Sequence, residues 1–332
     1  MKVDRGFVLR AVLGVAISVA AAVVLLNSVD VGAAIDVLRG ASPAAVGLMV
    51  VTVFLDIAAR GARWRALLEP IRRLPYPRVL GYTYLGYLAN NVLPARLGEL
   101  VRSHALGEGE GISRPTVLGT VVVERIVDTV IVVAVAAIAV VILGVGGIVS
   151  TGVLLGAAFV GVLIVGLVLA VSSHRLPGAD RVTAFAERLP RVLDLARRLR
   201  DGLAVVGEPR AIVAAVAFSL FAWSASIATF VVGGAAVGIS LTPAEGALLS
   251  SGVALATIVP SGPGYLGTFE LTAVGIATQF GIHADSAFAL ALLVHALILL
   301  VTSVGGVVGA MRLRVGLGTG PPVPEERRPA SG

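Results

Sequence analysis

Six stretches of the chain are almost continuously apolar, and their lengths predict a bundle of membrane-spanning helices. They cover residues 11–26, 44–59, 117–144, 151–172, 211–238 and 287–311. Each approaches the ~20 residues that an α-helix needs to cross the hydrocarbon core of a bilayer. The pattern therefore predicts an all-α polytopic membrane protein with about six full spans.

The first run could instead be the core of a secretory signal peptide, because it follows Lys2, Arg5 and Arg10. Two features argue against cleavage. The run exceeds the ~7–15 residues of a typical signal-peptide core. Residues 27–30, with the sequence Asn-Ser-Val-Asp, form a poor cleavage site. We therefore expect an uncleaved first helix.

Arginine crowds some connections between the runs and is missing from others, which indicates the orientation. It is concentrated in residues 60–78 and 175–210 and follows the last run, whereas residues 145–150, 239–243 and 282–286 contain neither Lys nor Arg. The positive-inside rule then predicts that both basic connections and both termini are cytoplasmic, in a multi-pass protein of the plasma membrane.

The composition supports a membrane protein and excludes several other classes. Hydrophobic residues make up 57% of the chain and charged residues 14%, and the mean hydropathy is +0.97. The chain has no cysteine, which excludes a disulfide scaffold and a thiolate metal site. The net charge of +6 comes from arginines between apolar runs, so we attribute it to topology and expect no nucleic-acid partner.

The basic connection at residues 175–210 has a pattern of its own. Within residues 179–200, apolar positions recur every three or four residues with arginines between them. This predicts an amphipathic helix on the inner leaflet, and a solvated basic loop is the alternative. We expect one membrane domain over residues 1–315 that includes this connection, followed by a disordered Pro-rich cytoplasmic tail over residues 316–332.

Two weaker hydrophobic stretches, residues 79–93 and 244–281, are associated with breaks at Pro and Gly. If residues 79–93 crossed the membrane, the arginine-rich residues 175–210 would lie outside, against the positive-inside rule. The conflict disappears if residues 79–115 enter from the cytoplasm and return, and residues 244–281 enter from outside and return. Each could be a re-entrant hairpin or a pair of short crossing helices.

Both breaks contain the sequence P-x-x-L-G, at residues 94–98 and 263–267. Because the two segments would enter from opposite sides, the shared sequence indicates a possible inverted-topology repeat. Broken helices point half-helix N-termini, with their partial positive charge, into the cavity between them. An anionic substrate is therefore expected between the breaks.

The first break contains charged residues that we expect to lie within the membrane. If the chain after Pro94 is helical, Arg96, Glu99 and Arg102 follow one another at three-residue steps and can form a ladder of ion pairs. The planar guanidinium suits bidentate binding of phosphate, so both arginines are candidates to hold a head group. A neutral ion-pair network that packs the hairpin is the alternative.

Further charges interrupt two of the apolar helices. Glu124, Arg125 and Asp128 lie within residues 117–144, where they either brace the first hairpin or contact the substrate. Asp56 precedes Arg60 by four residues, which predicts an ion pair at the end of a helix.

The second break matches G-x-G-x-x-G through Gly262, Gly264 and Gly267, but no strand precedes it, so we reject a dinucleotide fold. The glycines instead permit a tight turn. Glu270 opens the returning helix, where a carboxylate suits the helix dipole; it could also pair with an arginine or carry a proton. His295, in the last apolar run, is a proton relay or a packing histidine.

Three motifs follow one another along the chain. They are Asn90-x-x-x-Pro94-x-Arg96-x-Gly98-Glu99-x-x-Arg102, Glu124-Arg125-x-x-Asp128 and Pro260-x-x-Pro263-Gly264-x-x-Gly267-x-x-Glu270. In this order they resemble the lysylphosphatidylglycerol synthase transmembrane-region family, also described as flippase-like membrane proteins, over about residues 8–312. Tyr265 departs from the family pattern, which often has Gly there. The predicted substrate-binding residues are Asn90, Asn91, Pro94, Arg96, Gly98, Glu99, Arg102, Glu124, Arg125, Asp128, Pro260, Pro263, Gly264, Gly267 and Glu270.

The resemblance implies a role in lipid transfer between leaflets. In two-part members the membrane region is associated with moving an aminoacylated phospholipid, and a separate soluble domain performs the aminoacyl transfer. This chain ends at residue 332 without room for that domain, so we expect neither a lysylphosphatidylglycerol synthase nor an enzyme.

The leading hypothesis is a flippase-like protein that binds and translocates an anionic phospholipid or a lipid-linked substrate such as a polyprenyl phosphate or glycolipid. A membrane-embedded enzyme with Glu99 or Glu270 as base is one alternative. An accessory subunit that presents lipid to a glycosyltransferase or another envelope enzyme is the other. No cofactor and no metal is expected, because the chain has no metal-ligand spacing, nucleophile elbow or P-loop.

Overall fold

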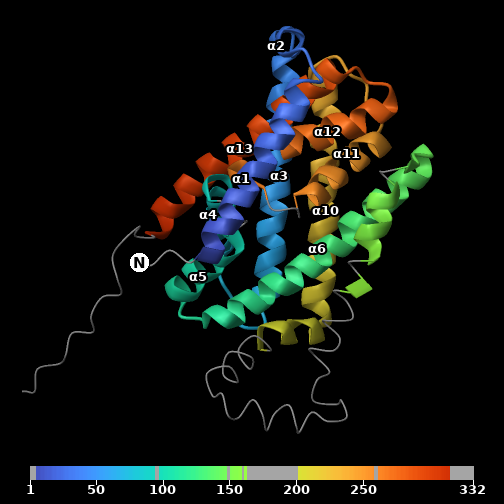
Figure 1. Cartoon of the computed structure of the whole chain (residues 1–332). Helices are drawn as coiled ribbons and strands as arrows, with labels where there is room; N and C mark the ends of the chain where they lie inside the picture. The colour runs from blue at the N-terminus through green and yellow to red at the C-terminus, as the bar shows by residue number, and fades with distance from the viewer. Residues whose placement is uncertain are drawn as a thin grey trace, which may run out of the picture.

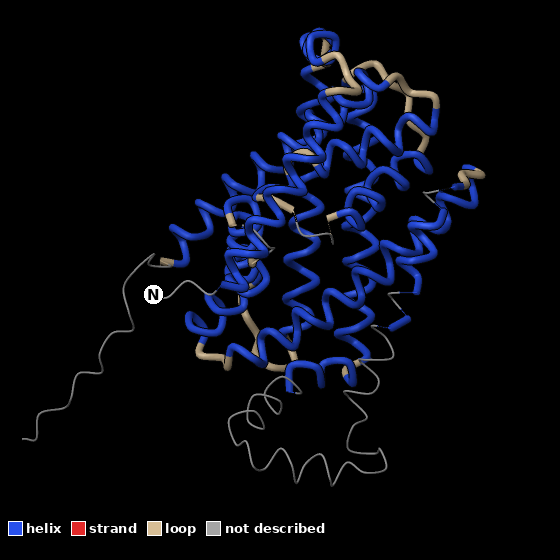
Figure 2. Tube along the Cα trace, viewed as in Figure 1, coloured by secondary structure: helices blue, strands red, loops and turns tan. Residues whose placement is uncertain are grey.

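The computed structural model describes residues 5–93, 97–147, 150–158, 161–162, 201–257 and 261–314. This part of the chain consists of helices joined by short loops and turns, without a strand (Figure 2). The all-α prediction is therefore confirmed for the described residues.

The α-helices and 3-10 helices are labelled as in Figure 1. In chain order they are α1 (Arg5–Leu26), α2 (Val31–Arg39), α3 (Pro43–Leu68), α4 (Tyr76–Val92), α5 (Gly98–Glu110), α6 (Arg114–Leu143), η3 (Ala204–Gly207), α10 (Pro209–Ala236), α11 (Pro243–Ala256), η4 (Pro263–Tyr265), α12 (Thr268–Ala277), η5 (Thr278–Phe280) and α13 (Ala284–Leu313).

Several helices begin where the sequence supplies a cap. Ser42, Ser113 and Thr242 stand immediately before α3, α6 and α11, and each side chain accepts a hydrogen bond from a backbone N–H three residues on. A proline lies in the first turn of each of these helices. The caps satisfy backbone donors that a helix N-terminus leaves unpaired, and proline has no N–H to lose there.

Four helices, α3, α6, α10 and α13, are long and apolar enough to cross a membrane. They confirm four of the predicted spans. α1 and α2 meet at a bend of 84° and add a fifth span only if the pair counts as one. The predicted count of six spans is thus not reached among the described residues. Of the predicted span at residues 151–172, only residues 151–158 and 161–162 are described, and these are helical.

Two helical hairpins complete the bundle, and each consists of helices too short to span by themselves. α4 and α5 pack together as one pair, and α11 and α12 as the other. Their lengths are 17, 13, 14 and 10 residues, below the ~20 residues of a full span. In Figure 1 the first pair enters from the end of the bundle where α6 begins, and the second from the opposite end.

The hairpins are packed between the long helices. α3 lies along α10, α4 along α13, and α11 along α6. η4, in the second break, contacts α4 of the first hairpin. The two breaks therefore face each other inside the bundle.

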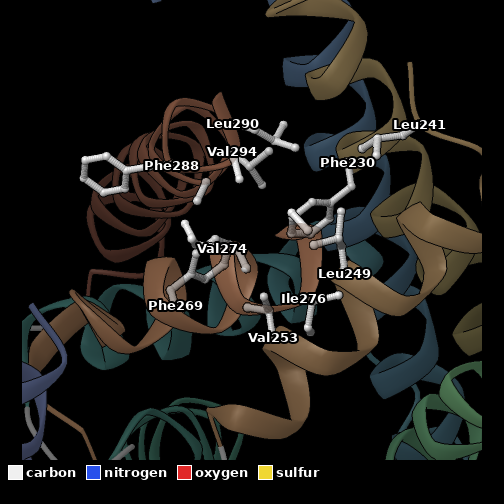
Figure 3. Close-up of a cluster of buried hydrophobic side chains, with 14 of the residues drawn as sticks. Phe230, Leu241, Leu249, Val253, Phe269, Val274, Ile276, Phe288, Leu290 and Val294 are labelled. Atoms are coloured by element: carbon white, nitrogen blue, oxygen red, sulfur yellow. The ribbon is translucent and has the colours of Figure 1, made fainter. Parts of the chain in front are cut away.

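A core of buried apolar side chains forms where α10, α11, α12 and α13 meet (Figure 3). Phe230, Leu249, Phe269 and Leu290 each come from a different one of these helices. The rings of Phe230 and Phe269 are stacked, with 6.3 Å between their centroids. This packing holds the second hairpin against the helices that flank it.

Some predicted features lie outside the described residues. They are Pro94, Arg96 and Pro260, the amphipathic segment within residues 179–200, and the tail of residues 316–332.

The close approach of α4 and α13 generates a first prediction. A Cβ at Gly306 would overlap the Leu88 side chain and lie 2.9 Å from the Tyr84 carbonyl oxygen, so Gly306→Ala should destabilise the protein by about 1–3 kcal/mol. In α12, a Cβ at Gly275 would meet no atom within 4 Å, so Gly275→Ala should not lower the stability. Thermal unfolding in detergent measures both; equal melting temperatures would contradict the tight α4–α13 contact.

Candidate functional site

A cavity of about 550 Å³ lies between the tips of the hairpins and the long helices α3, α6, α10 and α13. It lies inside the bundle. All four hairpin helices, α4, α5, α11 and α12, contribute lining residues, and so does η4. Charged, amide and aromatic side chains face it in addition to apolar ones. Such a mixture is typical of a ligand site that fixes orientation with a few polar groups.

Arg63 of α3 is the centre of the charge network behind this cavity. Its side chain has no exposed surface, and its NH1 group donates to Asp128 Oδ1 at 2.6 Å and to Ser219 Oγ at 3.0 Å. Its NH2 group donates to Glu124 Oε1 at 2.8 Å. Because one guanidinium bridges both carboxylates of α6, it joins α3, α6 and α10 at a single point.

Arg60, one turn earlier on α3, pairs with Asp56 through Nε at 2.7 Å and reaches Asp128 Oδ2 at 3.3 Å. The predicted Asp56–Arg60 ion pair is present, but it faces the cavity. Trp223 of α10 donates from Nε1 to Asp128 Oδ1 at 3.1 Å, and the Arg60 guanidinium carbon lies 5.3 Å from the centroid of its ring. Asp128 is thus bound by groups from α3 and α10.

Arg102 of α5 continues the network to the first hairpin. Its NH2 group lies 3.1 Å from Glu124 Oε2, and its guanidinium carbon stands 4.4 Å from the centroid of the Trp64 ring. Arg125 pairs with Glu124 at 3.0 Å and approaches Glu99 at 3.9 Å. In the described residues the predicted ladder along α5 is therefore replaced by pairs that cross between α5 and α6, because the acidic partners lie on the neighbouring helix.

The amide side chains of the first break satisfy neighbouring polar groups. Asn90 Oδ1 accepts the Gly98 N–H at 2.7 Å, which closes the turn between α4 and α5. Asn91 donates to the hydroxyls of Thr302 and Ser303 on α13, at 2.9 and 3.0 Å. A Cβ at Gly98 would overlap the Gly86 carbonyl oxygen, so only glycine permits the arms to meet this closely.

The second break turns through two consecutive residues with left-handed backbone, Gly264 at φ 64° and Tyr265 at φ 59°. Tyrosine rarely adopts such a φ, and it lies here at the position where the family pattern has Gly. Its ring lines the cavity. Gly267 follows at φ 82°, where a Cβ would lie 2.6 Å from the Ser18 carbonyl oxygen of α1. The Ser18 hydroxyl accepts the Gly262 N–H at 2.9 Å, so α1 closes this hairpin tip.

Glu270 of α12 pairs with His295 of α13 inside the bundle. Glu270 Oε1 lies 2.6 Å from His295 Nδ1, and both side chains are buried. The second carboxylate oxygen accepts the Gly267 N–H at 2.7 Å. The Phe269 ring is stacked on the imidazole, with centroids 4.1 Å apart. Of the roles considered for Glu270, pairing with an arginine is replaced by pairing with this histidine.

The predicted site residues separate into four groups. Glu124 and Glu270 stand behind lining side chains, bonded to Arg102 and His295. Pro263, Gly264 and Gly267 form the turn of the second break, and Pro94, Arg96 and Pro260 lie outside the described residues. Those lining the cavity are Asn90, Asn91, Gly98, Glu99, Arg102, Arg125 and Asp128. Their binding of a substrate remains a prediction.

Sequence reasoning missed Arg63, Trp64 and Trp223. Arg63 was assigned to a cytoplasmic basic connection, which is wrong because α3 continues to Leu68 and buries it. A signal was present: Asp56, Arg60 and Arg63 recur at four- and three-residue steps, on one face of a helix. Among the described residues, no group of three or more acidic or His side chains is arranged to hold a metal ion.

Replacing Arg63 should strongly destabilise the protein. Arg63→Met would leave Glu124 and Asp128 without their shared partner, and removing one member of a buried charge pair costs about 3–5 kcal/mol. Arg73→Met changes an 88% exposed side chain paired to Glu69 at 3.4 Å, so it should cost less than about 1 kcal/mol. Thermal unfolding in detergent compares them, and a similar loss in both variants would refute the bridging role of Arg63.

A curated relative from Haloferax volcanii, named Glycosyltransferase AglD, is similar to most of this chain. The two are 28% identical over 350 residues, which cover 93% of this chain and 55% of the relative. The chain thus spans about half the length of the curated relative that it matches.

This relative corrects one expectation. The sequence led us to expect no enzyme, because no room was seen for an aminoacyltransferase domain, and a membrane-embedded enzyme was kept as the alternative. The similarity runs through the membrane region itself and leads to a protein named as a glycosyltransferase, which points to an enzyme family instead. The expectation of no enzyme is therefore wrong.

A family model described as the lysylphosphatidylglycerol synthase TM region matches residues 11–306. The match includes both hairpins, the charge network on α3 and α6, and the Glu270–His295 pair. With its membrane-spanning helices, the chain is an integral membrane protein that belongs to the lysylphosphatidylglycerol synthase TM region family.

Proposed function

We propose that the protein binds the phosphate of an anionic lipid or lipid-linked head group in the cavity between the hairpins and passes it between leaflets. The observation that carries this proposal is the cavity itself, which exposes three arginine side chains in the interior of an apolar bundle. Charge at membrane depth is costly and usually serves a pathway or a site. The apolar tails of such a ligand can remain in the bilayer.

Arg125 is the arginine best placed to contact a ligand. Its side chain is 37% exposed, whereas those of Arg60 and Arg102 are 11% and 7% exposed. Its Nε is buried and has no hydrogen-bond partner in the described part of the chain. Arg102 is held by Glu124 and Trp64, so it supplies fixed positive charge at the wall. Arg96 remains a candidate for the same clamp from the sequence motif alone.

The packing scheme supports an inverted repeat as the basis of alternating access. If α3, α4, α5 and α6 correspond to α10, α11, α12 and α13, the main helix contacts occur in matched pairs. The contact of α4 with α13 matches that of α11 with α6, and α3 with α13 matches α10 with α6. The hairpins also enter from opposite ends (Figure 1). In transporters with such repeats, one half rocks against the other around a central site.

A glycosyl-transfer function on a lipid-linked substrate is the second candidate. The name of the Haloferax volcanii relative favours it. In that case the same arginines would hold the lipid phosphate while a second substrate reacts. A glycosyltransferase or another envelope enzyme that receives the lipid is the corresponding partner.

Arg125→Gln should weaken both binding and transfer of an anionic lipid by about 10- to 150-fold, because one charge-assisted contact to phosphate contributes roughly 1.5–3 kcal/mol. The assay is leaflet exchange of fluorescent phosphatidylglycerol in vesicles that contain the purified protein. Arg39→Gln, which alters a 77% exposed side chain on α2, is the control. Transfer by Arg125→Gln at the control rate would refute the phosphate contact.

We further propose that the chain lies in the plasma membrane with both termini in the cytoplasm. The chain has no cysteine, so a single introduced cysteine is an unambiguous labelling site. His283, between α12 and α13, is 86% exposed, and Arg73, between α3 and α4, is 88% exposed. A membrane-impermeant maleimide should label His283→Cys in intact cells and Arg73→Cys only after lysis. The reverse pattern would overturn this orientation.

A further inference from the structure

The Glu270–His295 pair is held in place by two hydrogen bonds and one stacked ring. Glu270 uses one oxygen for His295 Nδ1, at 2.6 Å, and the other for the Gly267 N–H, at 2.7 Å. Phe269 covers the imidazole face at 4.1 Å between ring centroids, and the same phenylalanine is anchored in the apolar core of Figure 3. Because Nδ1 is engaged by the carboxylate, the ring nitrogen that remains for a ligand is Nε2.

The imidazole belongs to the cavity wall. His295 lines the cavity together with Asn91, Phe269 and Tyr265, close to the tip of the second hairpin. Glu270 is not part of the lining and stands behind the histidine. A carboxylate in this position fixes the tautomer of the imidazole and stabilises its protonated form.

Among the described residues, the charges around the cavity balance before this pair is counted. Glu270 therefore adds one uncompensated negative charge to the described residues as long as His295 is neutral. An anionic head group that enters would add a second negative charge to a buried space, where uncompensated charge is expensive. Four arginines, Arg60, Arg63, Arg102 and Arg125, face four carboxylates, Asp56, Glu99, Glu124 and Asp128.

We propose that His295 and Glu270 form a proton-binding site that loads one proton when an anionic head group binds in the cavity. This proposal rests on the proposed function and specifies its coupling. The proton is added at His295 Nε2 and comes from water that reaches the cavity. The pair changes from a net charge of −1 to 0, and the incoming phosphodiester keeps its own charge. Binding and protonation therefore strengthen each other.

The corresponding position in the first half of the bundle explains why this pair would be the titrating one. There, Arg102 on the returning arm α5 pairs with Glu124 on the next helix α6, at 3.1 Å. In the second half, Glu270 on the returning arm α12 pairs with His295 on the next helix α13. An arginine keeps its proton under all physiological conditions, whereas histidine exchanges one near neutral pH. One half thus supplies fixed charge and the other adjustable charge.

Other titratable groups face the same cavity and must be separated from this pair in any test. Among the described lining residues they are Asp56 and Arg60 on α3, Tyr87 on α4, Glu99 and Arg102 on α5, Arg125 and Asp128 on α6, and Tyr265 in η4, whereas α10 and α11 contribute none. His295 is the histidine among the described lining residues. In water, imidazole titrates nearer to neutral pH than carboxylates, phenols and guanidinium groups do.

The test is calorimetric binding of dihexanoyl phosphatidylglycerol to the full chain in nanodiscs, in two buffers with different ionisation enthalpies. The phosphodiester of this probe does not titrate near neutral pH, so the difference between buffers counts protons taken up by the protein. We expect uptake approaching one proton at about pH 8, and a Kd that is up to about tenfold higher at about pH 8 than at about pH 7.

Two variants should change the result in opposite directions. His295→Gln retains the negative charge of Glu270 without a proton acceptor, so it should take up no proton and bind more weakly at about pH 6 than the wild type. Glu270→Gln removes that charge, and its amide oxygen can still accept the Gly267 N–H, so it should bind at about pH 8 at least as tightly as the wild type. A merely structural pair would give weaker binding in both variants.

His104→Gln is the matched control. His104 lies on α5 with a 53% exposed side chain near Glu108 and does not line the cavity. This variant should keep the proton uptake of the wild type. Binding by the wild type without proton uptake would overturn the coupling and leave the proposed function intact. Failure of the wild type to bind the probe at either pH would overturn both.

Discussion

Arg63 is a positively charged side chain with no exposed surface inside an apolar bundle. The surrounding helices supply the groups that neutralise its charge. Glu124 and Asp128 supply two negative charges from α6, and Ser219 binds the same guanidinium from α10. The second negative charge is balanced by Arg102, which thereby joins the first hairpin to α6. A buried ion pair is rarely a net source of stability. Its value here is geometric, because the shared ion pairs and hydrogen bonds fix where α3, α5, α6 and α10 meet.

The hairpin tips meet a second requirement, which is that backbone groups exposed by a broken helix must find partners inside the protein. Asn90 provides the partner for Gly98 in the first tip, and Ser18 and Glu270 provide those for Gly262 and Gly267 in the second. Side chains that might be assigned to a ligand are therefore occupied by the fold.

The sequence predicts the helical class, the four long spans and the places of the two breaks, since each depends on local apolar patterning or on Pro and Gly. Glu124, Arg125 and Asp128 could be found because charge interrupts an apolar run. Arg63 was missed because arginines that follow a run normally mark a cytoplasmic connection. Trp223 was missed for another reason: one tryptophan in an apolar helix has no local signal, and its bond to Asp128 exists only after α10 packs near α6.

The balance of charge limits how the cavity can bind an anion. In the described part of the cavity, arginines that face carboxylates of equal number do not create a strongly positive site. A phosphate bound by these residues must displace a carboxylate, approach the partly exposed Arg125, or arrive with a proton. Displacing Glu124 or Asp128 would disrupt the bridge at Arg63. The network is therefore best viewed as a rigid wall, and the adjustable elements are Arg125 and the pair on the second hairpin. Because Arg125 lies on α6 and the pair lies on α12 and α13, a head group held by both would bridge the two halves of the proposed repeat.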